Sequence, residues 1–197
     1  PLPPATATPR TPLGRLCEPD RRPGWLRLTG QESMNSLHHV TLVARRQQEH
    51  EMQAETRMDF APVCPEQMAG FTYCYDSMNF YLLGKTCTED GAAVLTLLRS
   101  DTGVIEEVCD PVPVPDGPLE LRLETTPDGR GAQFRWRADG GDWVDIGPVC
   151  TTSILTDEYC RGFTGAHVGL YAHDMAGLHG YADFDWLAVC CRRPEKG

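Results

Sequence analysis

The sequence predicts an all-β fold in which two antiparallel sheets pack face to face, a sandwich of the jelly-roll type. Three observations lead to this prediction. Apolar and polar residues alternate along most of the 197-residue chain, turn signals separate the alternating runs at short intervals, and no stretch combines helix caps with a helical period. A chain of this length fits one domain.

The strands are predicted from the alternation itself. In residues 51–60 the side chains on one face are Met52, Ala54, Thr56, Met58 and Phe60. Residues 118–126 and 132–138 alternate in the same way, which is typical of half-buried antiparallel strands. Further strands are expected at 25–29, 39–46, 66–75, 79–87, 92–99, 104–108, 143–146, 166–173 and 181–190.

The turns between these strands carry glycine in hairpin patterns. They read TEDGAA, SDTG, TPDGRG and ADGGDW. The segment nearest to a helix is RRQQEHEMQAE, but its apolar residues are too sparse for a buried helical face. We therefore predict no helix.

The chain divides into a sandwich domain and two short flanking segments. Residues 1–23 are rich in Pro and Arg and are expected to be a linker or tail; residues 24–191 form the sandwich, and residues 192–197 are a second tail. The chain lacks an initiator Met and a hydrophobic leader, so we expect it to be part of a longer protein. No apolar run approaches the length of a membrane span.

The formal net charge is −10, which argues against nucleic acids and anionic membranes as partners because both select clustered Lys and Arg. Nine cysteines are present, an odd number with no zinc-type spacing. Several lie within strand-like runs, where a free Cys packs as a small apolar residue. We predict reduced structural thiols and a cytoplasmic location; the alternative is a disulfide framework.

Histidines and acidic residues are the candidates for metal-binding or catalytic groups. His167 and His173 would share a strand face but lie about 20 Å apart, too far for one ion. Asp183 and Asp185 would share one face of a strand, with Phe184 and Trp186 on the other. A polar outer face explains this pattern; a calcium site or acid–base chemistry are the alternatives.

A set of aromatic residues could pack in the core or form a sugar-stacking platform. Most alternate in step with apolar neighbours, which favours the core: Tyr73, Tyr75, Phe80, Tyr81, Trp136 and Trp143. The chain has no G-x-S-x-G, phosphate-binding glycine loop or H-E-x-x-H motif.

Four segments together resemble the C-terminal sandwich domain of glycoside hydrolase family 43 β-xylosidases. They read GWLRLTGQESMNSLHHVTLVARRQQEHEMQAETRMDF, EQMAGFTYCYDSMNFYLL, DEYCRGFTGAHVGLYAHDMAG and YADFDWLAV. The resemblance runs from about Gly24 to Val189, and the order and spacing of the segments are more specific than any one of them.

The resemblance implies a concanavalin A-like sandwich packed against an N-terminal five-bladed propeller that carries the catalytic carboxylates. One sandwich loop adds an aromatic wall to the sugar pocket. In this chain the matching loop is GFTGAHVG, which places Phe163 in the pocket between Gly162 and Thr164. Xylooligosaccharide is the implied substrate, a homo-oligomer is possible, and this chain alone is expected not to hydrolyse an aryl xyloside.

The chain also departs from the family pattern. PLPPATATPRTPLG replaces the usual acidic–aromatic first strand, which puts one edge strand and any calcium site that needs its backbone in question. The cysteine content is unusual, and the 197 residues hold no propeller.

Three functions follow: an accessory domain, a stand-alone module that binds xylan or oligosaccharides, or an independent hydrolase with facing carboxylates. Only the first predicts an exposed apolar patch around Phe163.

Overall fold

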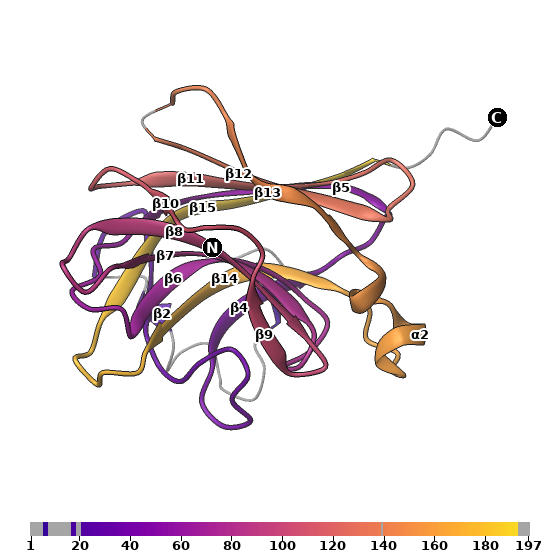
Figure 1. The fold of residues 1–197 in the computed structure, drawn as a ribbon, viewed down its shortest axis with the longest axis horizontal. Coiled ribbons are helices and arrows are strands. Elements are labelled where there is room, and N and C mark those ends of the chain that lie inside the picture. Colours follow the sequence, from indigo (N-terminus) through magenta and orange to yellow (C-terminus); the bar gives the residue numbers. More distant parts are fainter. Residues whose placement is uncertain (1–5, 8–16, 19–20, 139, 193–197) are drawn as a thin grey trace.

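The structure is a computed structural model that describes residues 6–7, 17–18, 21–138 and 140–192. Two antiparallel sheets lie face to face, which confirms the predicted sandwich (Figure 1). We call them sheet I and sheet II.

Sheet I contains the strand that follows the loop of Phe163. Its hydrogen-bonded order is β1 (Thr6–Ala7), β4 (Thr41–Arg46), β14 (His167–Asp174), β6 (Gln67–Cys74), β7 (Phe80–Cys87), β8 (Ala93–Asp101) and β10 (Val112–Pro113). The strand β9 (Val104–Glu107) pairs with β8 off this path.

Sheet II covers one face of sheet I. Its order is β13 (Val144–Thr151), β12 (Gly131–Ala138), β11 (Leu119–Thr125), β5 (Glu51–Asp59), β15 (Tyr181–Arg192), β3 (Leu26–Thr29) and β2 (Cys17–Glu18). The predicted strands all fall within a few residues of these bounds, so the alternation located them correctly.

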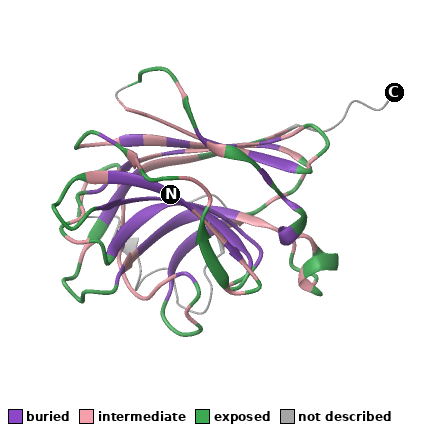
Figure 2. Cartoon of the chain, in the orientation of Figure 1, coloured by how far each residue is buried: buried purple, intermediate pink, exposed green. Residues whose placement is uncertain are grey.

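The main core lies between the sheets, and buried residues recur along the strands of both sheets (Figure 2). Along β5 and β11 every second residue is buried. Met52 and Met58 of β5 and Leu121 of β11 are buried there against Phe71 of β6 and Leu170 of β14. The outward residues of β5 and β11 are half-buried, so the sheet has the two-sided character that strict alternation predicts.

Sheet I is buried on both faces. Every residue of β6 and β7 is buried, and a second apolar cluster on the outer face includes Leu42, Phe80 and Tyr171. Met34 and Val40 belong to this cluster and come from residues 30–40. This segment bridges to β14 through Gln31–His173, and the Glu32–Val40 bridge joins its two ends. The outer face of sheet I at this cluster is therefore closed to a ligand.

Two single-turn helices contradict the prediction that the chain has no helix. They are the 3₁₀ turn η1 (Ser153–Leu155) and α2 (Asp157–Cys160), between β13 and β14. The Thr156 side chain accepts a hydrogen bond from the Tyr159 amide at 3.3 Å and so caps α2. Elements this short have no helical period for sequence analysis to detect.

Part of the predicted tail belongs to the sandwich. Thr6–Ala7 pairs with β4 and Cys17–Glu18 pairs with β3, so residues 1–23 add an edge strand to each sheet. At the other end β15 continues to Arg192, and residues 193–197 lie outside the described residues.

Of the nine cysteines, the eight whose side chains the structure describes are free thiols, as the prediction of unpaired cysteines requires. Burial raises the pKa of Cys150 to about 11, which keeps that thiol protonated and unreactive at neutral pH. Within the described residues, no helix is long and apolar enough to cross a membrane.

Phe134 lies in the core between the sheets. Its side chain is fully buried, and its ring centroid lies 6.0 Å from that of Tyr81, so its removal measures how much this core stabilises the fold. We expect Phe134→Ala to lower the free energy of unfolding by about 3–5 kcal/mol in urea titrations. Val104→Ala, at a position that is 67% exposed, is the control and should change it by less than about 0.5 kcal/mol. A loss below about 1 kcal/mol for Phe134→Ala would contradict the assigned core.

Candidate functional site

The loop between α2 and β14, residues 161–166, presents Phe163 to solvent. Its side chain is 93% exposed, more than any other large apolar residue among those described. The loop follows α2, which projects from one end of the sandwich (Figure 1). Phe163 therefore does not anchor the loop to the core, which was the structural alternative to a role in a pocket.

Glycine is required at both ends of the loop. A side chain at Gly162 would place its Cβ 2.3 Å from the Tyr75 hydroxyl oxygen. Gly165 has φ +67°, and a Cβ there would lie 3.0 Å from the Arg46 guanidinium. The two glycines let the backbone lie against Tyr75 at Gly162 and against Arg46 at Gly165.

Tyr75 and Asp157 hold the backbone on both sides of Phe163, and we call this pair the clamp. The Tyr75 hydroxyl donates to Asp157 Oδ1 at 2.7 Å, and the same oxygen accepts the Gly165 amide at 3.0 Å. The Tyr75 hydroxyl oxygen accepts the Thr164 amide at 3.3 Å, and the Asp157 carbonyl accepts the Gly162 amide at 3.1 Å. The backbone is thus fixed while the Phe163 side chain stays free.

The charge state of the clamp suits this role. The hydrogen bond from Tyr75 is the main cause that lowers the pKa of Asp157, and the Gly165 amide adds to it, so the carboxylate is ionised at neutral pH. Burial first, and then the bond to Asp157, raises the pKa of Tyr75, which keeps its hydroxyl proton available for donation.

His167 and Gln47 connect the loop to neighbouring strands. The Gly165 carbonyl accepts a hydrogen bond from His167 Nδ1 at 3.0 Å, and the Ala166 carbonyl accepts the Gln47 amide at 2.9 Å. Burial lowers the pKa of His167, so the ring is neutral at pH 7 and its proton lies on Nδ1, where this bond needs it.

Exposed apolar residues continue from Phe163 across the neighbouring turns. The Tyr159 hydroxyl donates to Asp101 at 2.8 Å, which ties α2 to the β8–β9 turn, and the Gly103 amide of that turn bonds the Met78 carbonyl at 2.9 Å. Tyr159, Met78 and Val104 are 45%, 44% and 67% exposed. Together with Phe163 they form what we call the end patch.

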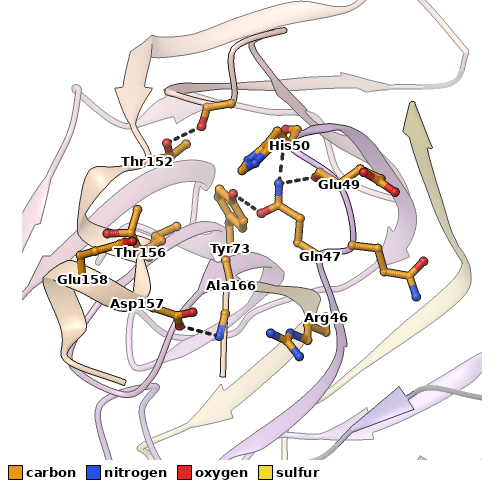
Figure 3. Close-up of a pocket in the computed structure, with 14 residues that line it drawn as sticks. Arg46, Gln47, Glu49, His50, Tyr73, Thr152, Thr156, Asp157, Glu158 and Ala166 are labelled. Carbon is orange, nitrogen blue, oxygen red and sulfur yellow. Dashed lines mark hydrogen bonds between the residues drawn. The ribbon is translucent and has the colours of Figure 1, made fainter. Parts of the chain in front are cut away.

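A polar pocket lies beside the loop, with a volume of about 360 Å³ (Figure 3). Its wall comes from the β4–β5 turn, η1, α2 and the Gly165–Ala166 backbone. The Tyr73 hydroxyl lies within it and donates to Gln47 Oε1 at 2.6 Å, while Thr152 donates to the Gly129 carbonyl at 2.6 Å. No pattern in the sequence predicts this pocket.

Asp183 and Asp185 are held by arginines. Arg27 donates from Nε and Nη2 to the two oxygens of Asp183, both at 2.8 Å, and Arg22 lies 3.3 Å from the same carboxylate. Arg57 lies 3.3 Å from Asp185. A calcium ion at Asp183 would have to displace two guanidinium groups. Among the described residues, no group of three His, Cys, Asp or Glu side chains could hold a metal ion.

A break in the strand alters the expected faces of β15. The register shifts between Phe184 and Trp186, so Asp183 pairs with Asp59 while Trp186 pairs with Arg57. Trp186 therefore shares the outer face with Asp183, whereas strict alternation predicted it opposite. A bulge of one residue reverses the alternation that follows it, and nothing in the local sequence signals it.

The candidate aromatic platform is largely core. Tyr73, Tyr75, Phe80 and Tyr81 are buried, as their alternation favoured. The guanidinium groups of two arginines stack on Trp143. The Cζ atoms of Arg122 and Arg137 lie 3.9 and 4.4 Å from the centroid of its ring.

The chain belongs to the family of β-xylosidase C-terminal concanavalin A-like domains, whose family model matches residues 2–189. This agrees with the resemblance seen in the sequence.

Similar proteins are longer than this chain. It is 38% identical over 190 residues to xylosidase/arabinosidase 43B of Humicola insolens, covering 90% of this chain and 35% of that protein. It is 34% identical over 172 residues to a xylan 1,3-β-xylosidase of a Vibrio species, covering 84% of this chain and 31% of that protein. The chain thus spans about a third of the length of these relatives.

The fold is shared with solved enzymes of the same kind. The crystal structure of the xylan β-1,4-xylosidase from Bacillus halodurans C-125 superposes with a TM-score of 0.85 at 26% identity. The match covers 95% of this chain and 39% of that one.

Asp183 should make stability depend on pH. Burial raises its pKa, but the bonds and charges of Arg27 and Arg22 outweigh that effect, so its pKa in the folded protein is lowered. The ionised Asp183 carboxylate therefore stabilises the folded protein at pH values above about 3.9, the pKa of Asp in an unfolded chain. This stabilisation is lost as the pH falls through the lower pKa that Asp183 has in the folded protein. We expect Asp183→Asn to cost on the order of 2 kcal/mol at pH 7, with the deficit shrinking below about pH 4 in urea titrations.

The matched control for this experiment is Asp185→Asn, because Asp185 is more exposed and has a single longer contact to arginine. It should cost less than about 0.5 kcal/mol at pH 7. Equal losses for the two variants, or a deficit that does not change with pH, would contradict the role given to Asp183.

The clamp predicts the mobility of the Phe163 loop. Tyr75→Phe removes the hydroxyl that bonds Asp157 and the Thr164 amide, so the Thr164 and Gly165 amides should exchange with deuterium several-fold faster than in the parent chain. Tyr159→Phe removes a hydroxyl of the same kind, bonded to Asp101 outside the clamp, and should leave both rates unchanged. Unaltered exchange in Tyr75→Phe would mean that other contacts fix the loop.

Proposed function

We propose that this chain is the accessory sandwich of a β-xylosidase-type glycoside hydrolase and that Phe163 forms a wall of the sugar pocket of a partner catalytic domain. The observation that carries the proposal is the near-complete exposure of Phe163 on a loop fixed by Tyr75 and Asp157. An aromatic side chain held rigidly in solvent is positioned to contact a partner.

The end patch supports a protein partner at this end of the sandwich. The loop is fixed at Gly162, Thr164 and Gly165, so only the length of one side chain separates Phe163 from the body of the domain. A domain that receives Phe163 therefore also lies close to Tyr159, Met78 and Val104, whose apolar exposure such a contact would cover.

The partner is proposed from the relatives, in which about two thirds of the length lies outside the region that matches this chain. We expect a propeller there, with the general acid and general base of an inverting hydrolysis roughly 6.5–9.5 Å apart. This chain would add the apolar wall that excludes water and orients a terminal sugar of a xylooligosaccharide. The free thiols support a reducing, cytoplasmic setting.

The stand-alone binding module has less support. Four of its six candidate aromatics are buried, and arginines stack on Trp143. In addition, the apolar outer face of sheet I is closed by residues 30–40. A sheet-face platform for a polysaccharide chain does not form from these residues.

The test is Phe163→Ala in the enzyme that contains both this sandwich and its catalytic domain. We expect kcat/KM for a xylooligosaccharide to fall by about tenfold or more, because an aromatic wall contributes on the order of 1–3 kcal/mol. Met175→Ala is the control, since Met175 is also exposed, at 55%, but follows the far end of β14. Unchanged kinetics in Phe163→Ala would refute the role of Phe163.

A further inference from the structure

The polar pocket beside the Phe163 loop has no role in the function proposed above. It is formed by this chain alone, and its volume of about 360 Å³ falls within the usual range of small-molecule sites. Its lining differs from the end patch on the same loop, because polar side chains dominate it (Figure 3).

Several of these polar side chains have unused hydrogen-bonding groups. Within the described part of the chain, the side chains of Arg46, Gln48 and Glu158 take part in no hydrogen bond or ion pair. The Arg46 guanidinium lies against the backbone at Gly165, where an added Cβ would be 3.0 Å from its Nε. Its donors therefore lie at the pocket, beside Gly165, which follows Phe163 by two residues.

The charges around the pocket indicate what it binds. Asp157 and Glu158 line it together with Arg46, so an anion would meet carboxylates and a cation would meet a guanidinium. A neutral hydroxyl group avoids both conflicts, because it donates to a carboxylate and accepts from an arginine or an amide. A sugar ring carries several such groups at once.

We propose that this pocket binds a neutral mono- or disaccharide. The arrangement needs no group from another domain, so the binding is a property of the chain itself. It is independent of whether Phe163 enters a partner's pocket.

The experiment is a titration of the isolated chain with xylose and with xylobiose, followed by backbone amide NMR shifts. Saturable shifts are expected at Gln48, Glu158 and Gly165, with dissociation constants in the millimolar range. Arg46→Ala should weaken binding by about tenfold or more, since it removes a charged donor. Glu158→Gln keeps an acceptor and should weaken it less.

Arg45→Ala is the matched control. Arg45 precedes Arg46 on β4, and successive strand side chains point to opposite faces, so this variant loses the same charge away from the pocket. Its affinity for xylobiose should stay within about twofold of that of the parent chain. An equal loss in both arginine variants would show a general effect of charge and overturn the site.

Two further outcomes would overturn the proposal. One is the absence of saturable shifts with both sugars; the other is binding of glucuronate or inorganic phosphate with no binding of neutral sugars, which would make the pocket an anion site.

Phe163→Ala in the isolated chain separates the two proposals. It should leave sugar binding unchanged, and loss of binding would place the sugar on Phe163 instead.

Discussion

The hydrogen bond between the Tyr75 hydroxyl and the Asp157 carboxylate connects the sandwich to its exposed aromatic residue. Tyr75 is buried at the end of β6, so its ring has a fixed position in the core. Asp157 is exposed on a helix of one turn, which tertiary contacts must hold in place. Through this bond the buried Tyr75 holds α2 and the loop backbone in place, so the Phe163 side chain is exposed on a loop whose backbone is fixed.

The same loop separates two surfaces of different chemistry. On one side the end patch offers Tyr159, Met78 and Val104, which suit contact with another protein surface. On the other side the polar pocket offers Arg46 and Glu158, which suit hydroxyl groups. The two glycines contribute to this arrangement, because they let the Tyr75 hydroxyl and the Arg46 guanidinium lie close to the loop backbone.

The outer face of sheet II shows why pairs of acids are weak indicators of a metal site. Asp183 has a lowered pKa, as a calcium ligand would, but the cause is Arg27 and Arg22. These residues lie 156 and 161 positions from it in the chain. An ionised carboxylate inside a sheet face needs a positive partner, and arginine satisfies that need without an ion.

The sequence by itself determined the two-sheet architecture, the positions of most strands and the identity of the loop that carries Phe163. Alternation is a local property of each strand. The buried face of Leu119, Leu121 and Leu123 can therefore be predicted without knowing which strands pair with theirs. Only the tertiary structure decided that Phe163 is exposed, that the Asp185 bulge turns Trp186 outward, and that Tyr75 reaches Asp157. The clamp joins residues 82 positions apart, and such contacts depend on how the strands pair across the whole chain, which no local pattern specifies.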